Sequence, residues 1–149
     1  MFNDTWVKAL SNTIALNLAD TTPGTYKGAL FTGSATPNMS QTNPAYGTSP
    51  WSTGNESSGP GYTAGGVSMT VTSFAELAGA TNKIGWKFST ISWTSTTITA
   101  EGLLVYVPGL SSRAVIFRWF GQPYLTSDGD FQVAFHTDGI LREKLRANP

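Results

Sequence analysis

Apolar and polar side chains alternate with a period of two over much of this 149-residue chain. That period is typical of β-strands whose two faces meet different surroundings. In residues 67–74, Val67, Met69 and Val71 take the apolar positions, and small polar residues stand between them. Six further segments have related patterns: residues 14–18, 26–32, 84–93, 98–107, 113–121 and 131–137. The pattern therefore predicts about seven strands.

Some of these strands have features of their own. Residues 98–107 become apolar on both faces, which indicates a central strand, and residues 113–121 have the same character. In residues 84–93 the apolar phase shifts, and a β-bulge near Ser89 or Thr90 would explain the shift. The first two strands are separated only by a turn sequence, so we expect them to pair.

A short helix is predicted ahead of the strands. Asp4 can cap its N-terminus, Trp6, Val7 and Leu10 fall on one side, and the pattern ends about two residues later. Turns rich in Gly, Pro, Ser and Asn divide the strands. We therefore predict a mainly β fold, a single-domain β-sandwich or jelly-roll-like barrel spanning residues 1–149.

Residues 33–65, which we call the arm, interrupt this regularity. They hold six glycines and four prolines, with one acidic residue and no basic one. Loops longer than about 15 residues are uncommon in compact domains and are usually functional or disordered. Tyr46, Trp51 and Tyr62 are large rings, which disordered segments tend to lack, so an ordered arm laid over a surface is favoured over a mobile insertion. We expect the arm to become ordered on assembly.

Glycines near the end of the arm precede the strand that begins at Val67. Gly59, Gly61, Gly65 and Gly66 allow the backbone to bend sharply there. The stretch GPGYTAGG resembles a phosphate-binding loop only superficially. No Lys-Ser or Lys-Thr follows it, and the next element is a strand rather than a helix whose N-terminus could hold an anion. We therefore reject a phosphate site.

Charge and composition argue against several classes of function. Nine basic residues balance nine acidic ones, and only 12% of the residues are charged. No basic field is available to gather nucleic acid or to hold an anionic membrane. Cysteine is absent, which excludes disulfides and thiolate sites. No stretch approaches the roughly 18 apolar residues of a membrane span, so we expect a soluble protein without a nucleic-acid or membrane partner.

Residues with potential chemistry are few and poorly placed. His136 is the only histidine, with Asp138 two residues on, but no serine stands in the Gly-x-Ser-x-Gly context of a nucleophile elbow. Asp128 and Asp130 resemble the start of a calcium loop, yet no acidic residue follows at the required distance. Asp-Gly between strands is first of all a hairpin turn. We expect no enzyme activity, no cofactor and no metal.

The remaining candidates are better explained by structure than by chemistry. Glu101 lies inside a predicted strand, and we expect it to form an ion pair with Arg113 or Arg118 on the neighbouring strand. Most of the tryptophans lie in apolar alternation and are expected in the core. These core tryptophans are Trp86, Trp93 and Trp119. Trp51 remains the one plausible exposed platform, of the kind on which sugars stack.

The end of the chain is basic. Residues 142–149 include Arg142, Lys144 and Arg146, and a charged run of this kind is usually a solvated terminus. Because the last apolar position is Leu141, we expect removal of the tail to leave the melting temperature nearly unchanged. We expect the tail to contact an acidic neighbour instead.

Four motifs follow one another along the chain: YKGALFT, GYTAGGVSMTV, WTSTTITAEGLLVYV and GDFQVAFHTDGIL. Their order and spacing resemble a group of small structural proteins encoded by tailed bacteriophages. Members of that group carry similar K-x-A-L-F-T, G-Y-T-A-G-G and W-x-x-S-T-I-T-A motifs and end in F-x-x-x-F-x-x-x-G-I-L. The match covers roughly residues 5–141. The chain departs from the group in residues 36–57 and after Leu141.

The resemblance implies a virion component without enzymatic activity. We expect a head decoration or cement protein that is assembled in the host cytoplasm, joins adjacent major capsid subunits and forms homo-oligomers on the virion. A minor tail, neck or fibre-associated protein is the alternative, as is a carbohydrate-binding module on a receptor-binding structure. A hydrolase would need activity that depends on His136. The predicted contact residues are Tyr46, Trp51, Tyr62, Arg142, Lys144 and Arg146.

Overall fold

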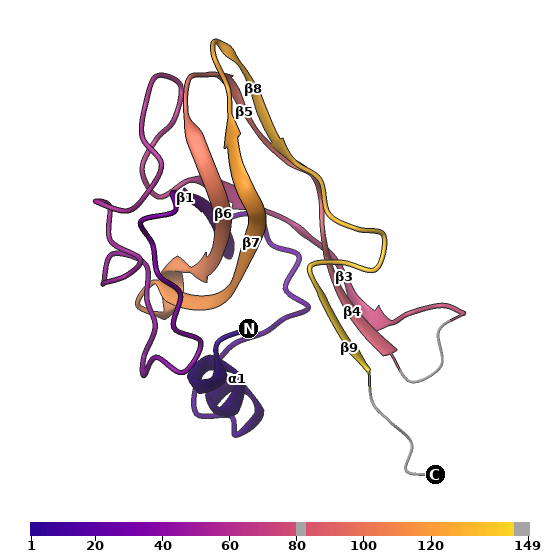
Figure 1. Ribbon diagram of the computed structural model, residues 1–149. Coiled ribbons are helices and arrows are strands. Elements are labelled where there is room, and N and C mark those ends of the chain that lie inside the picture. The colour runs from indigo at the N-terminus through magenta and orange to yellow at the C-terminus, as the bar shows by residue number, and fades with distance from the viewer. Residues whose placement is uncertain (80–82, 145–149) are drawn as a thin grey trace.

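The computed structural model describes residues 1–79 and 83–144 (Figure 1). Helix α1 spans Asn3–Leu10, and a short 3₁₀ turn, Pro108–Leu110, connects β6 to β7. The strands are β1 (Tyr26–Phe31), β2 (Val67–Met69), β3 (Val71–Glu76), β4 (Lys83–Phe88), β5 (Ile91–Thr96), β6 (Thr99–Val107), β7 (Arg113–Leu125), β8 (Gly129–Val133) and β9 (Leu141–Lys144). The predicted mainly β fold with a short N-terminal helix is confirmed.

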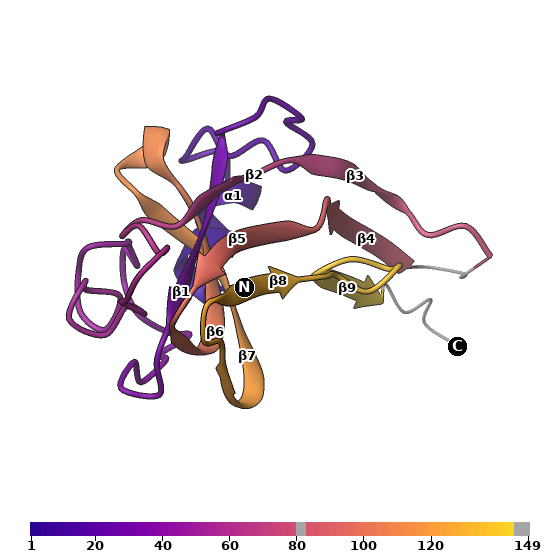
Figure 2. The same cartoon turned by 90° about the horizontal axis from the view of Figure 1, so that it is seen from above.

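The strands are arranged in two layers. One is a four-stranded antiparallel sheet in the order β2-β1-β6-β7, and the smaller sheets have the orders β3-β4-β9 and β5-β8. From above, β2 with β3, β5 with β4, and β8 with β9 form three long ribbons (Figure 2), and the first of these begins in the four-stranded sheet, where β2 pairs with β1. The fold is therefore β-sandwich-like.

Two of the ribbons bend at small polar residues. Thr70 separates β2 from β3, and Ser89 with Thr90 separates β4 from β5. The amide of Ser89 donates a hydrogen bond to the carbonyl of Thr70 at 3.0 Å, so the two ribbons bend where they meet. The apolar phase shifts at Ser89 and Thr90 because the chain passes there from the sheet of β4 to the sheet of β5. The prediction of a bulge within one strand is therefore wrong.

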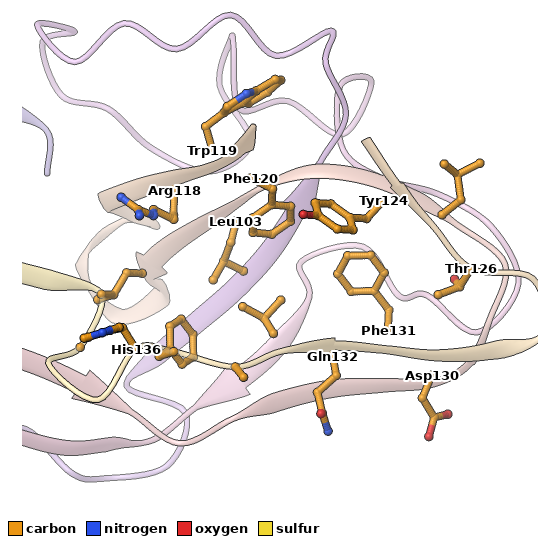
Figure 3. A pocket seen from close by; sticks show the side chains of 16 residues that line it. Leu103, Arg118, Trp119, Phe120, Tyr124, Thr126, Asp130, Phe131, Gln132 and His136 are labelled. Atoms are coloured by element: carbon orange, nitrogen blue, oxygen red, sulfur yellow. The ribbon is translucent and has the colours of Figure 1, made fainter. Parts of the chain in front are cut away.

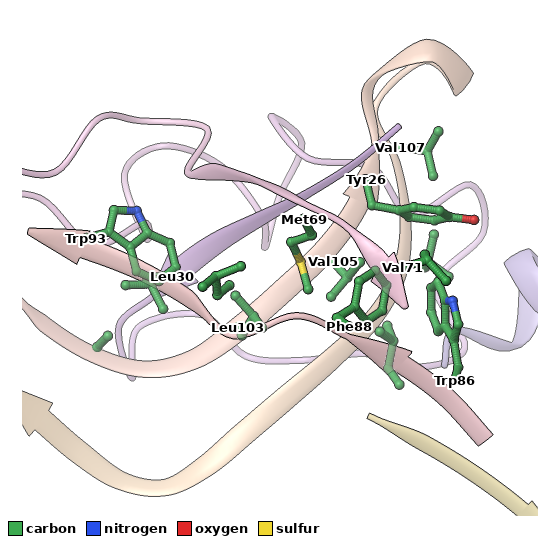
Figure 4. Packing of buried hydrophobic residues seen from close by; sticks show 14 of the residues in the cluster. Tyr26, Leu30, Met69, Val71, Trp86, Phe88, Trp93, Leu103, Val105 and Val107 are labelled. Atoms are coloured by element: carbon green, nitrogen blue, oxygen red, sulfur yellow. The ribbon is translucent and has the colours of Figure 1, made fainter. Parts of the chain in front are cut away.

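The larger hydrophobic cluster lies between the layers (Figure 4). Leu30, Leu103 and Met69 contribute to it from strands β1, β6 and β2 of the four-stranded sheet. Aromatic rings extend the cluster, with Tyr26 edge-on to Trp86 at a centroid distance of 5.2 Å. Such edge-to-face pairs add to the free energy gained by burying the rings.

A second hydrophobic cluster covers the opposite face of the four-stranded sheet. Phe31 of β1 and Leu104 of β6 meet Phe2 and Trp51 there. Strand β6 is therefore buried on both faces, and every residue from Gly102 to Val107 is buried. This confirms the prediction of a central strand and explains why it is apolar on both sides.

Helix α1 is anchored by its polar residues. Asp4 lies in the first turn and does not cap the helix; its carboxylate pairs with Arg113 on β7 at 2.9 Å. The Thr5 hydroxyl donates to the carbonyl of Ala114 at 2.7 Å. Val7 and Leu10, expected on a packed side, are 64% and 70% exposed. Trp6, the third residue of that side, packs against the larger hydrophobic cluster, so this ring and the polar contacts to β7 dock α1 together.

The segment after α1 differs from the prediction. Residues 14–18 form turns and irregular backbone rather than a strand. Strand β1 pairs instead with β2 and β6. Leu18 is buried and Leu16 packs against the main cluster, so their apolar character reflects packing of a loop.

The start of the predicted basic tail is part of a sheet. Arg142, Glu143 and Lys144 belong to β9 and pair with β4. Arg146 lies outside the described residues. The expectation that residues 142–149 contribute nothing to the fold is therefore wrong for the three residues of β9.

Truncation after Leu141 should consequently destabilise the protein. Removal of three paired residues of β9 forfeits backbone hydrogen bonds that contribute about 1 kcal/mol each. We expect the free energy of unfolding to fall by about 2 kcal/mol and the melting temperature by roughly 5 °C. A chain that ends at Lys144 is the matched control, and equal melting curves for both truncations would contradict the contribution of β9.

Candidate binding surface

Trp51 is not an exposed platform. Its side chain is fully buried between the rest of the arm and the outer face of the four-stranded sheet. The ring lies edge-on to Phe2 and Phe31, each at a centroid distance of 5.5 Å, and is tilted against Phe117 at 4.7 Å. The arm is thus laid over the chain's own sheet, with Trp51 at the centre of the contact.

Tyr46 and Tyr62 also point inward, towards a buried carboxylate. Glu56 is 4% exposed and accepts hydrogen bonds from both tyrosine hydroxyls at 2.7 Å. The amide of Gly65 donates to the same carboxylate at 2.8 Å. Three donors therefore compensate Glu56 for its loss of hydration.

The network around Glu56 joins the arm to both central strands. The Tyr62 hydroxyl accepts from the amide of Leu30 on β1 at 2.9 Å. The Tyr106 hydroxyl of β6 donates to the carbonyl of Gly65 at 2.9 Å, and its ring stacks on Tyr46 at 4.6 Å. Sequence reasoning did not single out Glu56, although it is the only charged residue among the 33 residues of the arm, and that is a usable signal.

The predicted sharp bend at the end of the arm is confirmed. Gly66 has a φ of 66°, in the left-handed region, and a β-carbon there would collide with the carbonyl of Gly28 on β1. Only glycine allows this close approach of two backbones. The bend delivers the chain directly into β2, beside β1.

The buried phenols predict a loss of stability at alkaline pH. Burial, followed by the nearby Glu56 carboxylate, raises the pKa of Tyr46 and Tyr62 well above the usual value, and that of Tyr106 to about 12. In the unfolded chain these phenols titrate near pH 10. Their contribution is therefore complete below about pH 10 and is lost as the pH rises towards the folded-state pKa values.

We expect a constant melting temperature up to about pH 9 and a steep fall above about pH 10. Circular dichroism melts across this range measure the effect. The variant Tyr106→Phe lacks one of the raised phenols and should show a shallower fall. A melting temperature that stays constant up to about pH 12 would refute the prediction.

The candidate catalytic residues do not form a constellation. His136 is exposed in the loop between β8 and β9, and its Nδ1 lies 3.8 Å from an oxygen of Asp138. Glu101 accepts a hydrogen bond from the amide of Gly33 at 3.0 Å. Its predicted ion pair with an arginine on the neighbouring strand does not occur among the described residues.

The predicted Asp-Gly hairpin is also wrong in its pairing. The segment with Asp128 and Asp130 connects β7 to β8, which belong to different sheets. Asp130 accepts a hydrogen bond from the amide of Ser95 on β5 at 3.2 Å. Among the described side chains of residues 1–79 and 83–141, no group of three or more histidine or acidic side chains is placed to hold a metal ion.

Exposed apolar side chains gather instead on the second half of β7. Trp119 is 42% exposed, Tyr124 46% and Leu125 73%. The predicted core position of Trp119 is wrong, because β7 continues past the part of the sheet that the arm covers. Gly121 and Pro123, which interrupt the alternation, are the sequence signal for this change.

A cleft opens between this half of β7 and strand β8 (Figure 3). We call it the β7–β8 cleft, and its volume is about 540 Å³. The side chains that carry the argument below are Leu103, Arg118, Phe120, Tyr124, Phe131 and Val133. The rings of Phe120 and Phe131 lie 6.4 Å apart, and Tyr124 is edge-on to Phe120 at 6.0 Å. The cleft is thus an aromatic-lined opening into the sandwich.

Comparisons with known proteins return no relative. No family model, no curated protein and no solved structure matches the chain. In the part of the chain that the structure describes, no helix has the length and apolar character needed to cross a membrane.

Proposed function

We propose that this chain is a structural protein of a tailed bacteriophage particle, namely a head decoration protein that joins neighbouring major capsid subunits. The motifs behind the resemblance support the proposal, because they are the parts that build the sandwich. YKGALFT is β1, GYTAGG supplies Tyr62 and the Gly66 bend, and WTSTTITAEGLLVYV spans β5 and β6. The resemblance thus concerns residues that specify the fold.

The observation that carries the proposal is the exposed apolar edge formed by β7. Trp119, Tyr124 and Leu125 are exposed on the second half of this one strand, and all three line the open aromatic cleft. Exposed apolar side chains gathered around an opening mark contact surfaces with other proteins, and Trp, Tyr and Arg are the residues that dominate binding energy at interfaces. The partner that we propose is the major capsid protein, with further copies of the chain as neighbours on the virion.

The exposed residues of β7 and the buried Trp51 also bear on the two alternative functions. A minor tail, neck or fibre-associated protein would use an apolar edge in the same way, so it remains the second candidate. A carbohydrate-binding module loses the ring proposed for it, because Trp51 is buried. Trp119 and Tyr124 do not form a shared platform on which a sugar could stack. The Trp119 ring lies against Phe117 of the second hydrophobic cluster, whereas the Tyr124 ring lies against Phe120, which lines the cleft.

Thermal release of DNA tests the proposal. A protein that bridges capsid subunits adds binding free energy to the assembled shell, so the shell should resist heat in proportion to occupancy. Particles that lack this chain should assemble, release DNA at a lower temperature and regain resistance when the purified protein is added. Unchanged thermal release together with lost adsorption to the host would place the protein on the tail and overturn the proposal.

A further inference from the structure

The β7–β8 cleft exposes the inside of the sandwich along one side. Phe131 and Val133 alternate with Asp130 and Gln132 along β8, so the apolar pair faces the cleft. Figure 3 shows the side chains of Asp130 and Gln132 leaving the β8 ribbon on the side away from the rings. The floor of the cleft is therefore aromatic and aliphatic.

A cationic group stands at one end of this apolar floor. Arg118 is exposed, and among the side chains that the structure describes, those of residues 1–79 and 83–141, no carboxylate forms an ion pair with it. Figure 3 shows Arg118 and His136 at the same end of the cleft, away from Tyr124. A second hollow of about 580 Å³, which includes Met1 and Ile116, shares Arg118 and His136 and extends the opening past them. Arg118 therefore lines both hollows.

The free edge of β7 is unsuited to pairing with a strand from another protein. Residues 120–123 of β7 lie opposite Glu101 alone, because the register shifts between the pairs Ala100–Tyr124 and Gly102–Trp119. Pro123 in this bulge has no amide hydrogen to donate. Bulges and prolines are devices that prevent edge pairing. An occupant of the cleft therefore gains no strand pairing from this half of β7.

The chemistry of the cleft also disfavours a sugar. Sugar recognition needs polar side chains that converge on hydroxyl groups next to a ring, and here the polar residues of β8 point away from the rings. An aromatic floor beside an unpaired guanidinium fits an apolar side chain that is followed closely by a carboxylate. The guanidinium can bind that carboxylate through two parallel hydrogen bonds.

We propose that the β7–β8 cleft receives a loop of a neighbouring virion protein, which packs an apolar side chain against the Phe120 and Phe131 pair and pairs an Asp or Glu with Arg118. This inference rests on the proposed function, since it names the surface through which the chain attaches to its neighbour. The Asp or Glu of the loop is opposite in charge to Arg118, and the apolar side chain of the loop suits the apolar rings that line the cleft. Attachment through the cleft does not require the basic tail, residues 142–149, for which the sequence predicts a contact with an acidic neighbour.

The first test measures binding of the labelled protein to particles that lack it. Arg118→Glu reverses the charge at the cleft, and Lys87→Glu on β4 is the control, because Lys87 does not line the cleft. We expect Arg118→Glu to weaken binding at least about tenfold, because the carboxylate of the partner then faces a like charge. Lys87→Glu should change binding by less than about twofold, because Lys87 is only half-buried and its charge lies away from the cleft.

A second pair of variants tests the apolar part of the cleft without changing charge. Ala134 follows the last residue of β8, is exposed and lines the cleft, so Ala134→Trp places a large ring at the opening and should hinder entry. Ala75→Trp on β3 places the same ring at an exposed position elsewhere. Melting curves establish that each variant is folded. If Arg118→Glu does not fold, Arg118→Gln and Ala134→Trp provide the same test.

Peptides that tile the capsid and neck proteins of the same particle identify the occupant. We expect the bound peptides to contain an apolar residue near an Asp or Glu, and a Glu→Lys change in such a peptide should restore binding to Arg118→Glu. If the wild-type protein binds to particles and neither Arg118→Glu nor Ala134→Trp weakens this binding, the inference is overturned and the proposed function stands. No binding of the wild-type protein would overturn both. Self-association of the purified protein that Ala134→Trp abolishes would assign the cleft to a second copy and overturn the assignment to another virion protein.

Discussion

Replacing Trp51 by alanine should lower the free energy of unfolding by about 3–5 kcal/mol, because it empties the centre of the contact between the arm and the sheet. The ring is fully buried and contacts Phe2, Phe31 and Phe117. Alanine leaves a cavity that these rings can fill only in part. For a domain of this size we expect a fall in melting temperature on the order of 10 °C.

Trp119→Ala is the matched control, because Trp119 lies on the same face of the sheet and its ring lies 6.3 Å from Phe117. Its side chain is 42% exposed, so its removal should cost less than about 1.5 kcal/mol. The indole Nε1 of Trp51 makes no hydrogen bond to any described residue, so Trp51→Phe changes only the size of the ring and should be milder than alanine. Equal melting temperatures for Trp51→Ala and Trp119→Ala would contradict the arrangement of the arm.

The second large effect is expected at Glu56. Glu56→Ala leaves the hydroxyls of Tyr46 and Tyr62 and the amide of Gly65 without their acceptor. A buried donor that loses its partner costs about 1–3 kcal/mol. We expect a total loss of about 3–5 kcal/mol, measured by denaturant unfolding.

Glu76→Ala on β3 is the control for Glu56→Ala, because Glu76 is exposed and belongs to another sheet. It should change the free energy of unfolding by no more than about 0.5 kcal/mol. Glu56→Gln keeps one acceptor oxygen and should lie between the two. Equal stability of Glu56→Ala and Glu76→Ala would show that the network does not stabilise the fold.

Hydrogen exchange separates a local effect from a global one. The rings of the arm are already packed against the chain's own sheet, so we expect protection of the amides around Tyr46 to Tyr62 in the free protein. This replaces the expectation that the arm becomes ordered only on assembly. In Glu56→Ala the amides of the arm should exchange faster, while those of β6 keep their protection at low denaturant. Rapid exchange of the arm in the wild-type protein would favour the earlier expectation.

The sequence by itself determined the fold class and much of the strand pattern. Alternation over residues 67–74 placed Met69 and Val71 inside, and both are buried. Apolar residues on both faces of residues 98–107 predicted a central strand, and β6 lies between β1 and β7. These predictions succeed because the side chains of a strand face alternate sides, so local sequence records which faces are covered.

Only the tertiary structure decided what the arm and β7 do. Residues 33–65 have no periodicity, so their sequence does not tell whether a ring faces the sheet or the solvent. For this reason the sequence predicts an exposed Trp51, which the structure buries. Trp119 continues the pattern of the buried part of β7 but lies beyond the cover of the arm. Arg142 and Lys144 were taken for a free tail, although their backbone pairs with β4. In each case burial depends on segments distant in sequence, which lie beyond the reach of local patterns.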